Sequence, residues 1–320
     1  MNLKYEKEIL LKGEEIKDLG LSTKVTDRMR LINRNGTFNI VRRGLSYFST
    51  FSIYHWLISM SWLRFVSLIL VFYFVTNILF ATLYYIGGDI NFAGTIHGNS
   101  FERFVDLFFF STQTFTTVGY GRINPVGIYA NIISSVESLA GLLSLAVITG
   151  VLYGRFVRPV AKIVYSDKAL IVPFKDITGF QFRIANKKSD HQMVDVEVEL
   201  MISSIKNNKR SFRNMKLEYE KISFFTTTWT VNHPIDSDSP LFGLTITDLK
   251  DINAEFLILL KGYDDTFAQV VHSRSSYKYD ELEWGAKFVS VYGMTGEGNT
   301  LIELDRISEY EKVELKNAAI

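Results

Sequence analysis

The chain has 320 residues, of which 47% are hydrophobic and 14% aromatic, and its 35 basic residues nearly balance its 34 acidic ones. This composition fits a folded protein with room for two domains and excludes wholesale disorder. The net charge of +1, without a basic stripe that carries interleaved aromatic residues, argues against nucleic-acid binding. Cysteine is absent, which excludes disulfides, thiolate metal sites and cysteine nucleophiles. The region after Met1 is polar and charged, so we expect no cleavable signal peptide there.

The first part of the chain predicts an arm followed by a helix at a membrane surface. Residues 1–33 are charged and favour helix without a strong apolar face, which is typical of a mobile cytoplasmic arm. Between Gly44 and Met60, large apolar and aromatic residues are interspersed with Ser, Thr, Tyr and His. That pattern favours a helix that lies in the membrane interface, with an ordinary surface helix as the alternative.

Two later stretches are apolar enough to cross a membrane. Phe65–Ile86 has no charged residue, and at roughly 1.5 Å per residue it crosses a hydrocarbon core of about 30 Å. Val126–Tyr153 begins after Pro125 and has Glu137 as its only charge. An acid inside a membrane is costly and normally faces protein or water. We therefore expect Glu137 to point toward the helix that precedes the second span, or into an aqueous cavity, rather than toward lipid.

The segment between the two spans carries the most informative motif. Phe104–Phe115 is apolar but too short to span, and it leads directly into Thr117-Val118-Gly119-Tyr120-Gly121. An extended chain with its carbonyls turned inward would offer stacked oxygen rings that replace the water shell of K⁺. Glycine suits this role because it tolerates the positive φ values that aim successive carbonyls to one side. One chain supplies one of four strands, so the motif predicts a homotetramer; a Gly-Tyr-Gly turn in a soluble protein is the alternative.

The distribution of basic residues predicts the orientation in the membrane. Arg155, Arg158 and Lys162 follow the second span and six arginines precede the first, whereas the connecting loop carries only Arg103 and Arg122. The positive-inside rule then places both termini in the cytoplasm. We expect a multi-pass membrane protein; the resemblance described below implies the plasma (inner) membrane of a bacterium. No helix carries regularly spaced arginines, so a voltage sensor of that type is not expected.

From Tyr165 onward the sequence changes to short β-branched and aromatic stretches separated by turn residues. This pattern predicts a β-sandwich of immunoglobulin-like architecture. Val194–Leu200 alternates most clearly, with one apolar and one acidic face, and Thr247–Asn253 predicts a short helix. The expected strands are Ala169–Pro173, Phe180–Ile184, Val194–Ile202, Phe212–Leu217, Phe224–Thr230, Glu255–Gly262, Phe267–Arg274, Ala286–Tyr292 and Leu301–Leu304.

These elements predict five consecutive parts of the chain. They are a cytoplasmic N-terminal arm, an interfacial slide helix, a two-span α-helical pore domain with a pore helix and selectivity filter, a cytoplasmic β-sandwich, and a C-terminal tail. The expected boundaries are residues 1–43, 44–61, 62–155, 156–305 and 306–320.

This order of elements resembles the inward-rectifier potassium channels, and particularly their prokaryotic KirBac branch. The resemblance extends from about Arg34 to about Leu304. Besides the filter motif, it is carried by Arg34-Asn35-Gly36, Phe110-Ser111, Ala130-Asn131, Arg155-Phe156-Val157-Arg158-Pro159, Ser273-Arg274-Ser275-Ser276-Tyr277 and Trp284-Gly285. It implies passive conduction of K⁺ as the transported ion, no cofactor, and no obligate protein partner beyond identical subunits.

The resemblance also implies the path of the ion. Tyr153 falls at the bundle-crossing gate near the cytoplasmic end of the second span. Leu145 falls at the cavity position where strongly rectifying animal members carry an acid, so weak polyamine-dependent rectification is expected. The ion ligands would be the filter residues Thr117, Val118, Gly119, Tyr120 and Gly121. The loop that narrows the cytoplasmic pore corresponds to Thr266, Phe267, Ala268, Gln269 and Val270.

Further positions would support the filter or regulate the channel. Gln113 stands where animal members carry a pore-helix acid and, with Glu137, is the candidate support behind the filter. Arg122 places a positive charge at the outer mouth unless Asp106 or Glu102 pairs with it. The family meets anionic lipid headgroups at positions that correspond to Arg42, Arg43, Arg155 and Arg158. Val160 and Ala161 interrupt the basic cluster of animal members, so inhibition by lipid and a general anionic-lipid effect both stay open alongside activation.

The sequence therefore predicts a homotetrameric, potassium-selective channel that anionic lipids modulate. It contains no glycine-rich phosphate loop, no supported Ser-His-Asp set and no zinc-ligand spacing, so an enzyme is not expected. Two alternatives remain. One is a poorly selective cation channel, if Gln113 and Arg122 loosen the filter. The other is a membrane-tethered sensor whose β domain binds a ligand and whose pore does not conduct.

Overall fold

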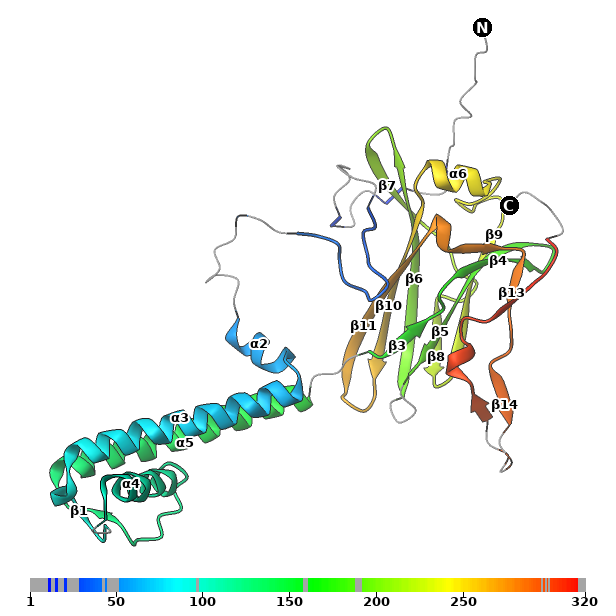
Figure 1. Cartoon of the computed structure of the whole chain (residues 1–320). Coiled ribbons are helices and arrows are strands. Elements are labelled where there is room, and N and C mark those ends of the chain that lie inside the picture. The colour runs from blue at the N-terminus through cyan, green and yellow to red at the C-terminus, as the bar shows by residue number, and fades with distance from the viewer. Residues whose placement is uncertain are drawn as a thin grey trace. The chain divides into compact units, whose positions relative to one another are not determined.

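The computed structural model divides the chain into two compact units, whose elements Figure 1 labels. The helical unit contains residues 44–158, and the β unit contains residues 1–43 together with residues 159–320. The structure describes residues 11–12, 15–16, 20–21, 29–41, 44, 52–95, 98–157, 161–187, 192–294, 296, 298 and 300–315. Three of the predicted lipid-contacting residues, Arg42, Arg43 and Arg158, lie outside the described residues.

The helical unit is built around two long apolar helices. Trp62–Gly87 and Ile128–Phe156 are each long and apolar enough to cross a membrane. Most of their apolar side chains are exposed on the single chain, as expected for helices whose surroundings are lipid or other protein. The described elements are α2 (Ile53–Ser59), α3 (Trp62–Gly87), η1 (Asp89–Asn91), β1 (Phe92–Ala93), α4 (Ser100–Phe115), β2 (Asn124–Pro125) and α5 (Ile128–Phe156).

Helix α4 begins at Ser100, earlier than the apolar run from Phe104 predicts, because Asn99 caps it. The side-chain Oδ1 of Asn99 accepts a hydrogen bond from the Glu102 N–H at 2.9 Å, and the Glu102 carboxylate accepts one from the Asn99 N–H at 3.1 Å. This reciprocal capping box satisfies two N–H groups that the start of a helix otherwise leaves unpaired. The additional turn places polar residues at the N-terminal end of a helix that is otherwise apolar.

An aromatic cluster holds α3 and α4 together with the short segment between them. Tyr84 of α3 is fully buried, and its ring lies 5.1 Å from that of Phe110 in α4 and 5.4 Å from that of Phe92 in β1, measured between centroids. Strand β1 pairs with β2 antiparallel, with Phe92 opposite Pro125. These contacts bring the start of α5 back beside the end of α3, so that α4 re-enters between the two long helices.

The β unit is a sandwich of two sheets (Figure 1). One sheet has the strand order β11-β10-β6-β7, with β8 also paired to β6; the other has the order β12-β4-β5-β3, with β9 also paired to β5. All pairs in these sheets are antiparallel except β12 with β4. The strands are β3 (Ile163–Tyr165), β4 (Ala169–Phe174), β5 (Ile177–Asn186), β6 (Met193–Lys206), β7 (Lys209–Asn214), β8 (Lys221–Phe225), β9 (Thr228–Ile235), β10 (Glu255–Asp264), β11 (Gln269–Lys278) and β12 (Leu282–Trp284).

Smaller elements complete the unit. Strand β13 pairs with β16 and β14 pairs with β15, both antiparallel. The helix expected over Thr247–Asn253 is present as α6. The bounds are α6 (Ile246–Asp251), η2 (Tyr279–Glu281), β13 (Ala286–Phe288), β14 (Tyr292–Met294), β15 (Thr300–Ile302), η3 (Leu304–Arg306) and β16 (Tyr310–Lys312).

The hydrophobic core lies between the two large sheets. Phe180 of β5 and Phe256 of β10 are both fully buried, and their rings stack at 4.6 Å between centroids. The alternation that the sequence shows in Val194–Leu200 places the apolar face of β6 in this core: Val196, Val198 and Leu200 are buried. The intervening acidic residues Asp195, Glu197 and Glu199 are exposed. A period of two residues therefore identifies correctly which face of β6 is buried.

Two expected strands are each divided in the structure. The stretch Phe224–Thr230 contains the end of β8 and the start of β9, and these pair with β6 and β5 respectively, in different sheets. The stretch Ala286–Tyr292 contains β13 and the first residue of β14, which also have different partners. A continuous run of β-branched and aromatic residues does not show where the chain crosses from one sheet to another.

Residues 31 and 32, at the end of the segment that the sequence predicted to be a mobile, helix-favouring arm, contact the strands of the β unit. The N–H groups of Leu31 and Ile32 donate to the carboxylate of Glu255, at 2.9 and 3.1 Å. Ile32 is buried and packs with Met201, Phe212 and Leu257 on the outside of the first sheet. The local composition does not reveal these contacts, because the partners lie far away in the sequence.

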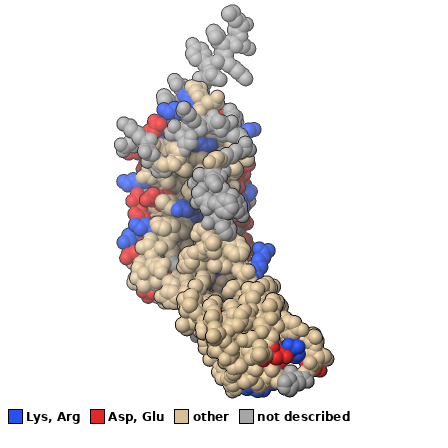
Figure 2. Space-filling view, turned by 90° about the vertical axis from the view of Figure 1, so that its left-hand side faces the viewer, with Lys and Arg blue, Asp and Glu red and all other residues tan. Residues whose placement is uncertain are grey.

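Charged side chains are distributed differently over the two units. In Figure 2 the visible face of the helical unit is nearly free of Lys, Arg, Asp and Glu except near one end, whereas the β unit shows both signs interspersed. A wide surface without charge is unusual in water and is the normal outer surface of a membrane-spanning bundle.

Candidate functional site

The five residues Thr117–Gly121, which come shortly after α4, have an alternating backbone conformation. The angle φ is positive at Thr117 (62°), Gly119 (54°) and Gly121 (81°), and Val118 and Tyr120 between them do not share it. A positive φ is uncommon for a β-branched residue such as Thr117, which indicates that the surroundings impose it. Alternation of this kind turns successive carbonyls to one side, whereas a regular strand alternates them. The segment can therefore present a row of oxygen atoms along one edge.

The backbone of Gln113 fixes the start of this segment. Its carbonyl accepts hydrogen bonds from the N–H of Val118 at 2.9 Å and of Gly119 at 3.3 Å, and the Thr114 carbonyl accepts one from the Thr117 N–H at 3.1 Å. These hydrogen bonds connect the last turn of α4 to the start of the segment that follows it in the sequence. Gln113 thus supports the segment that begins at Thr117 through its main-chain carbonyl.

Glu137 joins the three main helices of the unit. It is fully buried on α5, and its carboxyl group forms hydrogen bonds with the hydroxyls of Tyr84 on α3 and Ser111 on α4. The hydroxyl of Ser111 also lies 3.1 Å from Oδ1 of Asn77, whose Nδ2 donates to the Tyr73 carbonyl at 2.7 Å. Glu137 thus points toward α4, as its position in an apolar helix predicted.

Helix α5 also touches the end of α4 through its backbone. At Gly141 an added Cβ would lie 2.0 Å from the carbonyl oxygen of Phe115, the last residue of α4. No side chain other than hydrogen fits that distance. Gly141 therefore sets how closely α5 approaches the segment that begins at Thr117.

An ion pair lies next to the other end of the segment. Arg122 pairs with Asp106 of α4, whose side chain is 6% exposed. The sequence left open whether Asp106 or Glu102 would pair with Arg122. The structure favours Asp106, because the Glu102 carboxylate is engaged in the cap of α4. The positive charge beside Gly121 is therefore compensated within the chain.

Two of the predicted pore residues lie on one exposed stripe of α5. Leu145 and Tyr153 are 64% and 70% exposed on the single chain, and Thr149, also exposed, lies between them at helical spacing. The buried residues Glu137 and Gly141 face the other helices. This stripe is available to line a cavity or to meet another copy of the chain.

Arg155 forms hydrogen bonds with the end of α2. Its Nη1 donates to the Leu57 carbonyl at 2.5 Å and its Nη2 to the Met60 carbonyl at 2.7 Å, which satisfies acceptors at the C-terminal end of α2. The guanidinium also lies 4.6 Å from the ring centroids of Trp62 and Phe65. This cation–π geometry joins the end of α5 to α2 and to the start of α3.

In the β unit, the predicted constriction loop Thr266–Val270 covers most of a hairpin turn and the first two residues of β11. Strands β10 and β11 pair up to Asp264 opposite Gln269, so residues 265–268 form the connection. The Asp264 carboxylate accepts a hydrogen bond from the Phe267 N–H at 3.2 Å, and Ala268 has a φ of 50°. The loop is therefore a tight turn fixed by its own residues.

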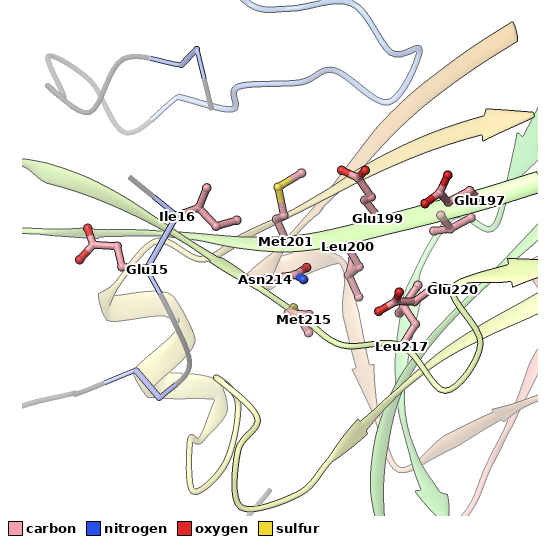
Figure 3. A pocket seen from close by; sticks show the side chains of 11 residues that line it. Glu15, Ile16, Glu197, Glu199, Leu200, Met201, Asn214, Met215, Leu217 and Glu220 are labelled. Carbon is pink, nitrogen blue, oxygen red and sulfur yellow. The ribbon is translucent and has the colours of Figure 1, made fainter. Parts of the chain in front are cut away.

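An acidic pocket of about 760 Å³ lies beside β6 (Figure 3). Carboxylates from the arm, from β6 and from the segment before β8 line it, and its described lining contains no Lys or Arg. These acidic residues are Glu15, Glu197, Glu199 and Glu220. A concave surface of one sign of charge raises the local concentration of cations.

Sequence reasoning did not identify Asn77, Tyr84 and Ser111 as a group with Glu137. Each is a polar residue in or near an apolar helix, and a search for polar residues within apolar helices would have found them individually. Their pairing depends on how three helices cross, which one sequence does not show.

Comparison with known proteins identifies the family. The family model for the inward rectifier potassium channel C-terminal domain matches residues 163–320, and the one described as ion channel matches residues 68–158. The chain is 37% identical to the inward rectifier potassium channel Kirbac3.1 of Paramagnetospirillum magnetotacticum over 286 residues, covering 88% of this chain and 95% of that relative. The chain belongs to the inward rectifier potassium channel family.

Other relatives are more distant. The inward rectifier potassium channel irk-1 of Caenorhabditis elegans is 24% identical over 83% of this chain and 54% of its own length. Among solved structures, the sporulation control protein Spo0M of Bacillus subtilis aligns with 39% of this chain and 50% of its own, with 13% identity and a TM-score of 0.21, which is too low to bear on the fold.

Family membership confirms several predictions made from the sequence. This inward-rectifier chain is a membrane protein of an ion-channel family, similar to a bacterial member, with two apolar helices and a C-terminal β domain. Potassium is the ion that the family transports, and the matching families are channels rather than enzymes.

Proposed function

We propose that four copies of this inward-rectifier chain surround one axis and conduct K⁺ selectively through the carbonyl oxygens of Thr117–Tyr120. The alternation of positive φ at Thr117, Gly119 and Gly121 carries this proposal, because such an alternation allows successive carbonyls to point to one side. Oxygen rings from four such segments replace the hydration shell of the ion. Val118 and Tyr120 are 53% and 80% exposed on a single chain, which supports assembly with further copies.

The proposed path continues along α5 into the cytoplasm. Leu145 faces the cavity below the filter, and Tyr153 narrows the path at the end of α5. Their exposure on one stripe of the single chain supports both roles. The segment Thr266–Val270, which comprises the end of the hairpin turn and the first two residues of β11, is the proposed constriction of the cytoplasmic part of the pore.

Both termini are proposed to lie in the cytoplasm, where anionic lipid headgroups modulate the channel. The proposed headgroup contacts are Arg42, Arg43 and Arg158. Each arginine near an anionic leaflet contributes about 1 kcal/mol. Arg155 acts differently in this proposal: its bonds to Leu57 and Met60 keep α2 attached to α5 at the same surface.

Two observations favour the selective channel over a poorly selective one. The main-chain carbonyl of Gln113 holds the start of the filter through two hydrogen bonds, and these do not depend on the side chain at this position. The charge of Arg122 at the outer mouth is paired with Asp106 and does not repel cations as a free charge would.

The test is cation flux through the purified full-length protein in liposomes. Uptake of K⁺, Rb⁺ and Na⁺ would be compared with and without Ba²⁺, in vesicles with increasing fractions of anionic lipid. We expect Ba²⁺-sensitive uptake of K⁺ and Rb⁺, little uptake of Na⁺, and a change in rate with anionic lipid.

Other results would support the alternatives. Equal uptake of Na⁺ would indicate a poorly selective pore. An intact tetramer without flux in any lipid, beside a working positive control, would favour a membrane-tethered sensor. A monomer by mass measurement in detergent and in lipid would contradict the assembly.

A further inference from the structure

Three oxygen–oxygen contacts connect the buried groups around Glu137. One joins the Tyr84 hydroxyl to Oε2 of Glu137, one joins the Ser111 hydroxyl to Oε1 of Glu137, and one of 3.1 Å joins the Ser111 hydroxyl to Oδ1 of Asn77. Each contact brings two oxygen atoms within hydrogen-bond distance, so each needs one hydrogen between them. Three contacts therefore need three hydrogens.

The side chains supply two hydrogens if Glu137 is ionised. Tyr84 and Ser111 each have one hydroxyl hydrogen, an ionised carboxylate has none, and the amide oxygen of Asn77 only accepts. The amide cannot be turned round to supply the third, because its Nδ2 donates to the Tyr73 carbonyl at 2.7 Å and a carbonyl cannot donate in return. One contact would then press two electron-rich oxygens together.

We infer that Glu137 carries a proton and acts as a hydrogen-bond donor in the native channel. The carboxylic acid donates from Oε1 to Ser111, Ser111 donates to Asn77, and Tyr84 donates to Oε2 of Glu137. All three contacts then have one hydrogen each. Glu137 is by this account a positioning residue: it holds α4, and through α4 the Thr117 segment, without placing a negative charge behind it.

The surroundings agree with a neutral group. Glu137, Ser111 and Asn77 are all fully buried. Among the residues that the structure describes in the helical unit, the ion pairs are Arg103 with Asp89 and Arg122 with Asp106, and neither includes Glu137. The groups that face Glu137 are the hydroxyls of Tyr84 from α3 and of Ser111 from α4, so no described cation balances a carboxylate there.

Infrared spectroscopy of the full-length channel in lipid tests the protonation state directly. A protonated carboxyl group has a C=O stretch that is separate from the bands of carboxylates and that shifts in D₂O. At neutral pH we expect one such band in the wild type, shifted by ¹³C-labelled glutamate, and its absence in Glu137→Gln. The matched control is Glu197→Gln, an exposed acid of β6, which should keep the band. Wild-type protein without any labelled protonated-glutamate band would overturn the inference, and this measurement needs no variant to fold.

Substitution separates the hydrogen-bond donor from the charge. In Glu137→Gln the amide nitrogen donates to Ser111 and the amide oxygen accepts from Tyr84, so all three contacts keep a hydrogen. We expect Rb⁺ uptake within about twofold of wild type for Glu137→Gln, and a loss of about tenfold for Glu137→Leu, which removes two buried bonds. A Gln variant as impaired as the Leu variant would show that the negative charge itself is needed.

The flux readout rests on the proposed function, but the spectrum does not. If the wild type conducts no ion, the proposed function fails while the infrared band still decides the protonation state. If the wild type conducts and the band is absent, the inference fails and the proposed function stands.

Discussion

The guanidinium of Arg30 forms two parallel hydrogen bonds with the carboxylate of Glu281, Nη1 to Oε1 at 3.0 Å and Nη2 to Oε2 at 2.7 Å. Arg34 adds a bond from its Nε to Oε1 at 3.0 Å. The side chains of Arg30 and Glu281 are 17% and 18% exposed. This bidentate pair fixes residues 29–41 to the end of β11 and to η2, so one carboxylate anchors the polypeptide between the arm and α2.

We predict that Glu281→Gln loosens this anchor and changes its dependence on pH. Burial by itself raises the pKa of Glu281, but hydrogen bonds from the Lys278 N–H and Arg30, with the charges of Arg30 and Arg34, lower it overall. The stabilisation is therefore present above the unfolded-state pKa and is lost as the pH falls through the folded-state pKa. We expect the variant to lose about 2–3 kcal/mol locally at neutral pH.

Hydrogen exchange of residues 29–41, measured over a range of acidic to neutral pH, checks this prediction. In the wild type, the protection of these residues against exchange should decrease as the pH is lowered. In the variant, protection should already be low at neutral pH and should change little with pH. The exposed Glu220→Gln is the control and should follow the wild type. Parallel pH profiles for wild type and Glu281→Gln would contradict the assignment.

Gly141→Ala should disturb conduction much more than Gly150→Ala. An added Cβ at Gly141 would lie 2.0 Å from the Phe115 carbonyl oxygen, whereas at Gly150 it meets nothing within 4 Å. Relief of such an overlap by backbone movement costs about 1–3 kcal/mol. We expect Gly141→Ala to reduce Rb⁺ uptake about tenfold, with the tetramer retained by size-exclusion chromatography. Equal uptake by the two alanine variants would show that the close approach of α5 to α4 is not required.

Asp106→Asn should leave the charge of Arg122 unbalanced at the outer mouth. Repulsion of incoming cations should lower K⁺ uptake at low ionic strength, and salt should reduce the difference because it screens exposed charges. Adding Arg122→Gln to the Asp106→Asn background should restore uptake at low salt. If the double variant is as slow as the single one, the defect comes from the lost contact and not from the charge.

Leu145→Asp should make outward current sensitive to polyamines. The side chain is 64% exposed on the single chain, and four acids in one cavity would attract a multivalent cation from the cytoplasmic side. Spermine applied to that side should block the variant at concentrations at least about tenfold below those for wild type. Leu145→Asn, which is polar but uncharged, is the matched control. Unchanged spermine block in Leu145→Asp would place this residue outside the conduction path.

The sequence predicted the membrane helices and the motif between them because both depend on local chemistry. An apolar stretch of sufficient length, such as Phe65–Ile86, has few structures open to it other than a spanning helix. The positive φ at Gly119 and Gly121 follows from the freedom of glycine. The apolar face of β6 follows from a period of two residues, which needs no knowledge of its partners.

The features that the sequence did not predict depend on contacts between residues that are distant in the chain. Tyr84, Ser111 and Glu137 come from three helices, and no local pattern relates them. The hydrogen bonds from Leu31 and Ile32 to Glu255 were not predicted, because Glu255 is more than two hundred residues away in the chain. The bonds of Arg155 to the carbonyls of Leu57 and Met60 were not predicted, because those carbonyls lie at the end of another helix.

The bonds of Arg155 to Leu57 and Met60 have a mechanical consequence. They attach α2 to the last turn of α5, which carries Tyr153. A sideways displacement of α2 would pull on α5 through the two hydrogen bonds that the charged guanidinium of Arg155 donates. If Tyr153 narrows the pore as proposed, a movement of α2 would be transmitted to that point.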